Sequence, residues 1–255
     1  VAALFWCDGA GGNTANYDSE VLELNGSRIG KVPPKLLKWI EEGNDPPKII
    51  VQEARKRGLD VFYSFRINDI HDSFIPEELA SFKIAHPEWL IDNTYYGAST
   101  ALNFAIPEVR DLKLRVIEEI FEKYDFDGIE IDFKRASPFF QPFHEYRNRH
   151  FLTDFLRIVR ESLNERGKER GREIELAVRV NENLEACKLD GFDVETWVKE
   201  GLVGILIMGT GTIDIDIPAF RELVQGTPVR IYPCLYGWPS GYMPIPDNLA
   251  RGIAY

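Results

Sequence analysis

The sequence predicts an α/β protein whose parallel strands form a (β/α)8 TIM barrel that lacks its last β/α unit in this chain. Short runs of β-branched and aromatic residues alternate with amphipathic helical patterns, which is typical of a parallel sheet covered by helices. No Pro- or Ser-rich linker divides the 255 residues, so we expect residues 1–255 to form a single domain of a longer protein. Polar residues gather where several strands end, and barrel enzymes hold their substrates at that end.

Seven segments are predicted to be strands, because each is a short apolar run bounded by turn-forming residues. In chain order they are Ala3–Cys7, Val61–Arg66, Ala101–Phe104, Gly128–Phe133, Ile174–Val180, Val203–Met208 and Val229–Leu235. A closed barrel of this kind needs an eighth strand and its helix. A doubly wound sheet with helices on both faces is the alternative fold.

The segments between the strands have helical periodicity and residues that mark helix ends. The predicted helices are Pro34–Glu42, Pro47–Arg57, Pro107–Tyr124, Tyr146–Arg166, Val194–Glu200, Pro218–Gln225 and Asp247–Ala254. Pro107 suits a first helical turn, where its missing N–H is not needed, and Glu108 interacts favourably with the positive end of the helix dipole. Gly58 is a typical stop after the second helix. Long loops follow several strands, and loops in that position commonly carry function.

Composition narrows the class of partner. The formal net charge is -11, which argues against binding to nucleic acid, because that affinity depends on Lys and Arg neutralising phosphates. It also argues against docking on anionic membranes, and no apolar run is long enough to span one. This negative charge does not hinder the binding of a neutral carbohydrate. Cys7, Cys187 and Cys234 form neither a metal signature nor a disulfide framework, so buried free thiols are expected.

The segment Phe126–Arg135 carries the strongest functional signal. Side chains alternate along a strand, so Gly128, Glu130 and Asp132 point to one side while their apolar neighbours point to the other. Carboxylates on a covered strand cost free energy unless they have partners or a role. Paired carboxylates are the usual catalytic groups of glycoside hydrolysis.

Asp132, at the end of this strand, is the predicted nucleophile. Glu130 lies one layer lower, where it tunes the pKa of Asp132 or binds the substrate. Arg179, on the next strand, is expected to pair with one of them and to keep a carboxylate ionised. Glu182, just after that strand, is the predicted acid/base, at about 5–5.5 Å for a retaining or 6.5–9.5 Å for an inverting enzyme. The structural alternatives are an ion network at Asp132 and a solvated loop acid at Glu182.

Polar residues follow the second predicted strand and are candidates for binding sugar hydroxyls. They are Arg66, Asn68, Asp69 and His71. One of them is also a candidate proton shuttle. A metal site at Asp69, His71 and Asp72 is disfavoured, because the four His include no pair at ligand spacing, so no metal or other cofactor is expected.

Aromatic residues near strand ends are candidates for stacking against sugar rings: Trp6, Tyr232 and Trp238. Asp8–Thr14 is glycine-rich, but it lacks the Gly-Lys-Ser/Thr of a phosphate-binding Walker loop and the third Gly of a dinucleotide fingerprint. We interpret it as a barrel loop.

These motifs resemble the glycoside-hydrolase-like barrels, specifically the family-10-like group of bacterial glycosyl hydrolases. The resemblance rests on Tyr124–Arg135, Pro107–Arg110, Arg66–Asp72, His86–Trp89 and Gly191–Trp197, and it extends from Tyr63 to Gly204. It implies a (β/α)8 barrel that acts on a polysaccharide or glycoside, and a secreted or periplasmic location is favoured by that substrate class. By analogy with amylase-like barrels, Asp132 matches a nucleophile on strand four and Glu182 an acid/base after strand five. Arg135, inside the first motif, is expected to bind substrate.

The same strand is similar to the family-18 chitinase signature Asp-Gly-x-Asp-x-Asp-x-Glu, with one important departure. Lys134 stands where that signature has its proton-donating Glu, and Glu130 replaces its first inner Asp. A substrate-assisted chitinase mechanism is therefore not expected. The alternatives to a glycosidase are a barrel that binds glycans without cleaving them, a carbohydrate lyase and a metal-dependent barrel enzyme.

Overall fold

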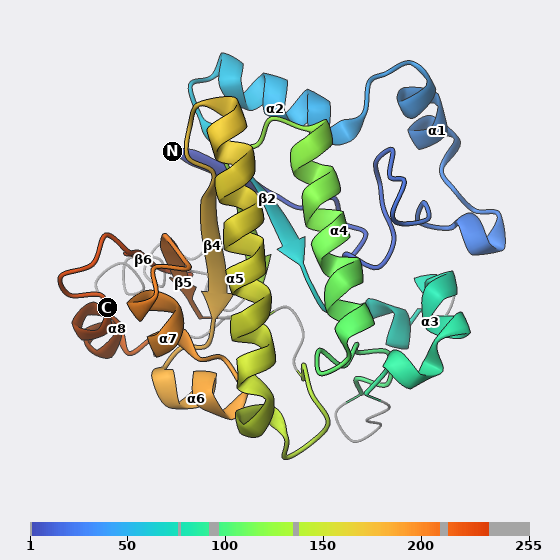
Figure 1. Ribbon diagram of the computed structural model, residues 1–255. Helices are drawn as coiled ribbons and strands as arrows, with labels where there is room; N and C mark the ends of the chain where they lie inside the picture. The colour runs from blue at the N-terminus through green and yellow to red at the C-terminus, as the bar shows by residue number, and fades with distance from the viewer. Residues whose placement is uncertain (1, 76–77, 92–96, 135–137, 210–213, 235–255) are drawn as a thin grey trace.

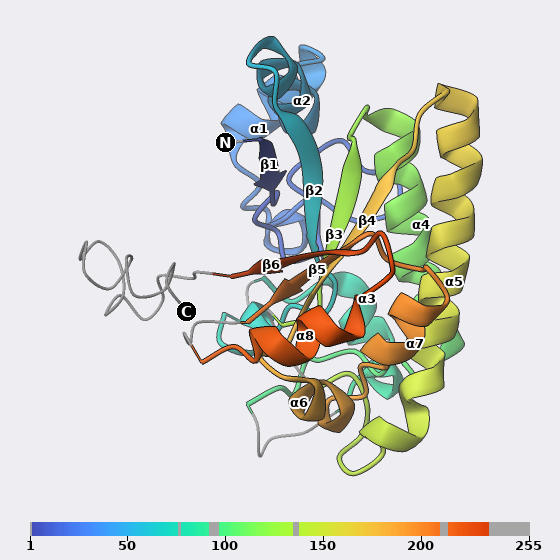
Figure 2. The same ribbon diagram turned by 90° about the vertical axis from the view of Figure 1, so that its left-hand side faces the viewer.

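The computed structural model describes residues 2–75, 78–91, 97–134, 138–209 and 214–234. Within them, six strands form one parallel sheet whose spatial order follows the chain from β1 to β6 (Figure 1 and Figure 2). The strands are β1 (Ala3–Trp6), β2 (Asp60–Arg66), β3 (Gly128–Asp132), β4 (Glu175–Val180), β5 (Ile205–Met208) and β6 (Arg230–Pro233). The sheet is curled, as the turned view shows (Figure 2).

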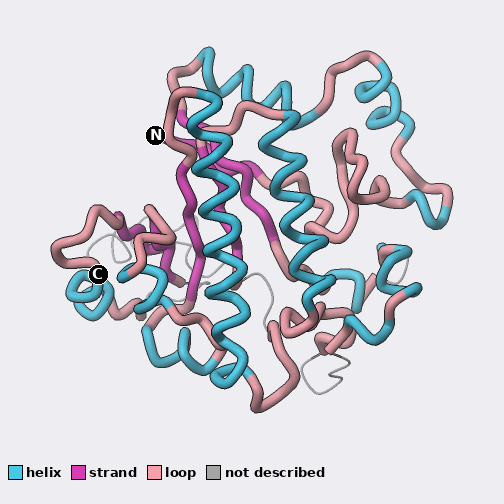
Figure 3. The backbone as a smooth tube through the Cα atoms, in the orientation of Figure 1, coloured by secondary structure: helices cyan, strands magenta, loops and turns pink. Residues whose placement is uncertain are grey.

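Helices alternate with the strands, as the sequence predicts. They are α1 (Pro34–Glu41), α2 (Pro46–Lys56), α3 (Ser81–Ala85), α4 (Pro107–Lys123), α5 (Glu145–Arg170), α6 (Leu184–Leu189), α7 (Val194–Lys199) and α8 (Ile217–Leu223). The 3-10 turns in the described parts of the long loops are η1 (Ser27–Ile29), η2 (His71–Ser73) and η4 (Pro87–Trp89). Figure 3 shows how much of the chain between β1 and α1, and between β2 and α4, is loop. None of the described helices is both long and apolar enough to cross a membrane.

The strand order decides between the two predicted folds. A doubly wound sheet reverses its strand order at a switch point, whereas a barrel adds each strand beside the last. The six described strands run in sequence without a reversal. The long helices α4 and α5 pack side by side against one face of the sheet (Figure 2). The sheet is therefore consistent with an incomplete (β/α) barrel, and the doubly wound alternative is wrong.

The predicted strand Ala101–Phe104 does not join the sheet. Leu102 makes only an isolated antiparallel bridge to Leu90. The segment is apolar because it is buried under the loops, where the Asn68 side chain accepts a hydrogen bond from Leu102 N and Phe139 O accepts one from Phe104 N. Asp132 therefore lies on the third strand of the described sheet and not on the fourth. The predicted helix Asp247–Ala254 lies outside the described residues.

The alternation predicted for β3 is confirmed. Ile129, Ile131 and Phe133 are fully buried in the core beneath the helices, and the strand is buried along its whole length. On the inner face, the Phe62 ring lies where a Cβ on Gly128 would be, so only glycine fits at this position of β3. Phe62 forms a small inner cluster with Ala177 and Ile205.

Candidate active site at the carboxyl ends of the strands

Strand register places the predicted site residues in one row across the inner face. Arg66 on β2 pairs with Asp132 on β3, which pairs with Arg179 on β4. The row continues through Ile207 on β5 to Tyr232 on β6. Because parallel strands end at the same edge of the sheet, this row lies at the carboxyl ends, where barrel enzymes carry their active sites.

Asp132 and Arg179 form a buried, two-pronged ion pair. Arg179 Nε donates to Asp132 Oδ1 at 2.9 Å, and Arg179 Nη2 donates to Oδ2. Asp132 Oδ1 also accepts a hydrogen bond from the backbone N of Lys134 at 3.0 Å. The side chains are only 5% and 13% exposed. Burial disfavours the charge on Arg179, but the charge and hydrogen bonds of Asp132 outweigh it and raise the pKa of the guanidinium.

Glu130 lies one layer below Asp132 on the same face. It pairs in register with Ser64, whose hydroxyl donates to Glu130 Oε2 at 2.5 Å. Burial and the neighbouring charge of Asp132 raise the pKa of the Glu130 carboxyl, against the opposing effects of Ser64 and Arg179. The two carboxyls on this strand therefore differ in environment, because the pKa of Glu130 is raised while Asp132 has the two-pronged cationic partner.

The raised pKa of Glu130 predicts that the effect of Glu130→Gln on stability depends on pH. A raised folded-state pKa means that the folded protein holds this proton more tightly than the unfolded chain. The contribution of Glu130 to stability therefore falls as pH rises from the unfolded pKa of about 4.3 through the folded value. We expect the variant to gain stability relative to the native protein between pH 4 and pH 7, measured by urea unfolding of both. A difference that stays constant or falls with pH would contradict this.

The loops after β3 and β4 are tied together beside this row. Lys134 Nζ donates to Asp190 Oδ2 at 2.9 Å, and Asn181 Nδ2 donates to the same oxygen at 2.9 Å. The lysine at the chitinase-like position is thus part of an ion pair that holds two loops. Glu182 is half-buried in the second loop, and its backbone carbonyl accepts a hydrogen bond from Asp216 N at 2.9 Å. That contact joins the loop to the start of α8.

Asn68 holds other loops in place. Its amide donates to the carbonyls of Leu102 and Pro138, at 3.2 and 3.0 Å, and its Oδ1 accepts from Leu102 N at 2.8 Å. The side chain is 1% exposed. We therefore assign Asn68 a positioning role in place of the predicted contact with sugar.

Asp69 and His71 form a second polar group, at the end of β2. Asp69 Oδ1 accepts from His71 N at 2.8 Å and lies 2.5 Å from His71 Nδ1. Asp69 Oδ2 lies 3.5 Å from Arg66 Nη1, so Arg66 links this group to the Asp132 row. These residues line a cavity of about 190 Å³ with the loop at Gly9–Thr14.

The family of the chain follows from comparison with known proteins. A family model described as glycosyl hydrolase-like 10 matches residues 10–145, which is more than half of the 255 residues. The chain belongs to the glycosyl hydrolase-like 10 family. The matched residues of this glycosyl hydrolase-like 10 chain include Asp132, Glu130 and the Asp69 group, whereas Arg179 and Glu182 lie beyond them.

Two relatives of this chain are named as glycosyl hydrolases. Glycosyl hydrolase DigH of Escherichia coli (strain K12) is 28% identical over 130 residues, which are 47% of this chain and 28% of that protein. Glycosyl hydrolase YngK of Bacillus subtilis (strain 168) is 31% identical over 97 residues, 36% of this chain and 18% of that protein. The chain thus spans less than a third of the length of either relative.

Solved structures similar to this glycosyl hydrolase-like 10 chain are distant. A noncanonic maltogenic alpha-amylase AmyB from Thermotoga neapolitana has a TM-score of 0.43 at 12% identity, with 74% of this chain and 40% of that one covered. A glycoside hydrolase family 18 N-acetylglucosaminidase from Paenibacillus barengoltzii has a TM-score of 0.40 at 16% identity. The match covers 63% of this chain and 39% of that one. At this distance neither supports an argument about the site.

The predicted aromatic residues are divided between the two faces of the sheet. Trp6 pairs in register with Tyr63 and packs against the helix-side core, so it faces away from Asp132. Tyr232 lies on the inner face and is half exposed. Trp238 and Arg135 lie outside the described residues.

Cys187 is buried as predicted, but Cys7 and Cys234 are only partly buried, and Arg179 Nη1 donates to the Cys234 sulfur at 3.8 Å.

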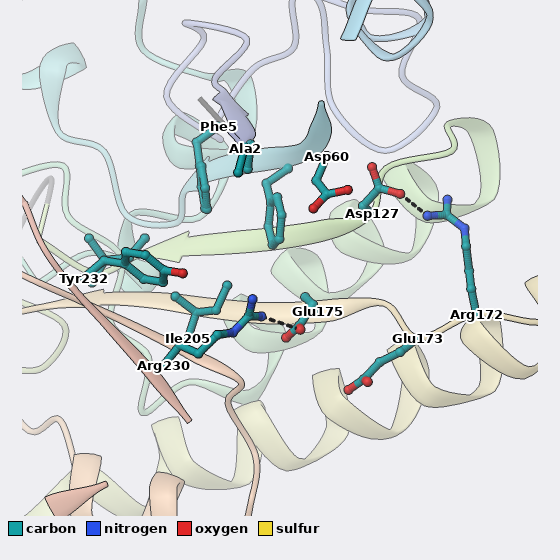
Figure 4. A pocket seen from close by; sticks show the side chains of 13 residues that line it. Ala2, Phe5, Asp60, Asp127, Arg172, Glu173, Glu175, Ile205, Arg230 and Tyr232 are labelled. Atoms are coloured by element: carbon teal, nitrogen blue, oxygen red, sulfur yellow. Dashed lines mark hydrogen bonds and ion pairs between the residues drawn. The ribbon is translucent and has the colours of Figure 1, made fainter. Parts of the chain in front are cut away.

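A larger cavity, of about 550 Å³, lies along the inner face and extends to Ile207 and Tyr232 of the Asp132 row (Figure 4). It reaches Asp60 and Glu175, the first residues of β2 and β4, and it is lined by apolar side chains that include Phe5 and Ile205. Phe5 stacks on Phe62 with ring centroids 4.5 Å apart. We interpret this cavity as barrel interior between the edge strands β1 and β6.

Two buried lysines support the loops around the Asp69 group, and neither was predicted from the sequence. Lys113 Nζ donates to Gly12 O and, at 3.1 Å, to Asn13 Oδ1. Burial, reinforced by the charge of Lys83, lowers the pKa of Lys113 to about 7. Lys83 Nζ donates to Asp72 Oδ2 at 2.7 Å with both side chains buried. The sequence feature that could have revealed Lys113 is its place within the apolar stripe of α4.

Among the described residues, no group of three His, Cys, Asp or Glu is arranged to hold a metal ion.

Proposed function

We propose that the protein is a glycoside hydrolase that uses Asp132 as its nucleophile on a polysaccharide or glycoside. The observation that carries this proposal is the buried ion pair of Asp132 with Arg179 at the carboxyl ends of the strands. The family membership supports the reaction class. A nucleophilic carboxylate must be ionised, and a guanidinium that donates to both of its oxygens stabilises the ionised form.

The proposed reaction has two steps. Asp132 attacks the anomeric carbon and forms a glycosyl-enzyme ester, while Glu182 gives a proton to the departing glycosidic oxygen. Glu182 then takes a proton from water, which attacks the ester and releases the sugar with its anomeric configuration retained. Glu182 lies on the loop after β4, the strand that also carries Arg179, and the contact with Asp216 holds that loop. Glu130, with its raised pKa, adds less negative charge beside Asp132 than an ionised carboxylate would.

The first experiment measures release of reducing ends by the purified protein from plant, algal and microbial glycans and from aryl glycosides. The proposal expects turnover on at least one of them. Binding without turnover would favour a non-catalytic glycan-binding barrel, and products with unsaturated ends would favour a lyase.

Glu182→Gln tests the proton donor. Loss of a general acid typically costs about 10²–10⁴-fold in rate. We expect a loss of that size on natural glycans, whose alkoxide leaving groups need a proton, and little effect on glycosylation by aryl glycosides with acidic leaving groups. Measuring the initial burst and the steady rate for both substrate types separates the two steps. Equal losses on both, or no loss, would exclude Glu182 from this role.

A further inference from the structure

The cavity beside Asp69 has walls that fit together closely. The loop at Gly9–Thr14 forms one wall, and the end of β2 and η2 form the other. A Cβ on Gly11 would lie 2.9 Å from Asp69 Cβ and Cγ, so the glycine lets the loop approach the carboxylate. The backbone of Gly11 has φ +70°, which also favours glycine. Lys113 and Asn13 hold this loop from behind.

One oxygen of Asp69 has no hydrogen-bond donor. Asp69 is 3% exposed, and both contacts with His71 use Oδ1. Oδ2 is buried and accepts no hydrogen bond; its nearest cationic group is Arg66 Nη1 at 3.5 Å. Buried carboxylate oxygens are normally satisfied. Because Asp69 is a lining residue of the cavity, its unsatisfied oxygen points to a group supplied from outside the chain.

Arg66 offers the complementary groups beside that oxygen. The Arg66 guanidinium has five N–H donors. Its Nη1 forms an ion pair with Asp69 Oδ2 at 3.5 Å, and its charge also acts on Asp8 and Cys7. An acceptor and a set of donors therefore lie side by side at the cavity. A hydroxyl group suits both, because it donates one hydrogen bond and accepts another. It also reproduces the hydrogen bonds of any water that it displaces.

The charge of the lining selects the ligand further. Asp69, Asp72 and Glu78 line the cavity together with Arg66 and the partly exposed His71, and buried Lys83 pairs with Asp72. An anionic ligand would meet like charges at short range. A neutral ligand rich in hydroxyls avoids this repulsion and still satisfies Asp69 Oδ2.

We propose that this cavity binds one neutral sugar ring through a hydroxyl that donates to Asp69 Oδ2 and accepts from Arg66. The choice of a sugar rests on the proposed function, while the selection for a neutral hydroxyl rests on the cavity itself. Arg66 stands opposite Asp132 in the strand register, so the bound ring is the neighbour of the ring that reacts. The protein therefore acts on chains with neutral sugars at this position and rejects uronic acids there.

Equilibrium binding tests this without relying on turnover. Glucose, galactose, mannose, xylose and N-acetylglucosamine are compared with glucuronic and galacturonic acid by calorimetry and saturation-transfer NMR. We expect at least one neutral sugar to bind, and its acidic counterpart to bind at least tenfold more weakly. Asp69→Asn and Arg66→Met should each weaken the binding of the neutral sugar at least tenfold. Asp111→Asn, in an exposed helical pair with Arg115, is the matched control and should change nothing.

Several outcomes would overturn the subsite. They are no binding of any neutral sugar to the native protein, equal or tighter binding of the uronic acids, and unchanged binding in both Asp69→Asn and Arg66→Met. If Asp69→Asn does not fold, Arg66→Met decides alone. Binding to the Asp132→Asn protein separates the two proposals, because the subsite predicts that binding persists there. Retained turnover in that protein would contradict the nucleophile and leave the subsite standing.

Discussion

Asp132→Asn is expected to abolish glycoside hydrolysis while the protein stays folded. The amide keeps the size of the side chain, and its oxygen still accepts from Arg179 or Lys134 N, but it cannot form the glycosyl ester. Removing a catalytic nucleophile costs on the order of 10⁴–10⁶-fold in kcat. The measurement is kcat on the best substrate from the glycan screen, with circular dichroism recorded on the same preparation.

Two controls make this result interpretable. Asp111→Asn removes an exposed carboxylate on α4 and should leave kcat unchanged. Glu130→Gln keeps the hydrogen bond from Ser64 and should retain far more activity than Asp132→Asn. Turnover within tenfold of the native value in Asp132→Asn would exclude this residue as the nucleophile.

Arg179→Leu is expected to have the largest effect on stability. It leaves Asp132 charged, buried and beside Glu130, with the backbone N of Lys134 as a remaining donor. Breaking a buried ion pair by removing one partner typically costs about 3–5 kcal/mol. The free energy of unfolding in urea at pH 7 should fall by that amount, and activity should fall with it.

The double variant Asp132→Leu with Arg179→Leu shows whether the loss comes from the unpaired charge. Replacing both members of a buried pair by apolar residues is often close to neutral. We expect the double variant to recover most of the lost stability but none of the activity. A double variant that is less stable than Arg179→Leu alone would mean that the pair stabilises the fold directly.

The sequence predicted the centre of the site because two simple regularities act together there. Alternation along residues 128–133 separates the carboxylates from Ile129, Ile131 and Phe133, and the structure confirms this separation. Parallel neighbours that end at one edge then bring Arg179 beside Asp132. The side of a strand that a residue occupies is a local property, and consecutive parallel strands usually lie next to each other, so the sequence can reveal both.

Other predictions failed where burial has a different cause. Residues 101–104 are as apolar as a strand, but they are buried by loops and bonded to Asn68. Trp6 ends a strand as expected, yet its register with Tyr63 places it on the helix side. The environments of Lys83 and Lys113 depend on loops distant in sequence, and a helical pattern with one lysine in its apolar stripe does not reveal their partners.

The most direct test of Asp132 as the nucleophile is peptide mapping after reaction with a 2-deoxy-2-fluoro glycoside matched to the best substrate. The fluorine slows hydrolysis of a glycosyl-enzyme ester, so the covalent intermediate accumulates. We expect one added glycosyl mass on the peptide that contains Asp132, and none in the Asp132→Asn protein. An adduct on another residue, or inverted product with no adduct from an active enzyme, would contradict it.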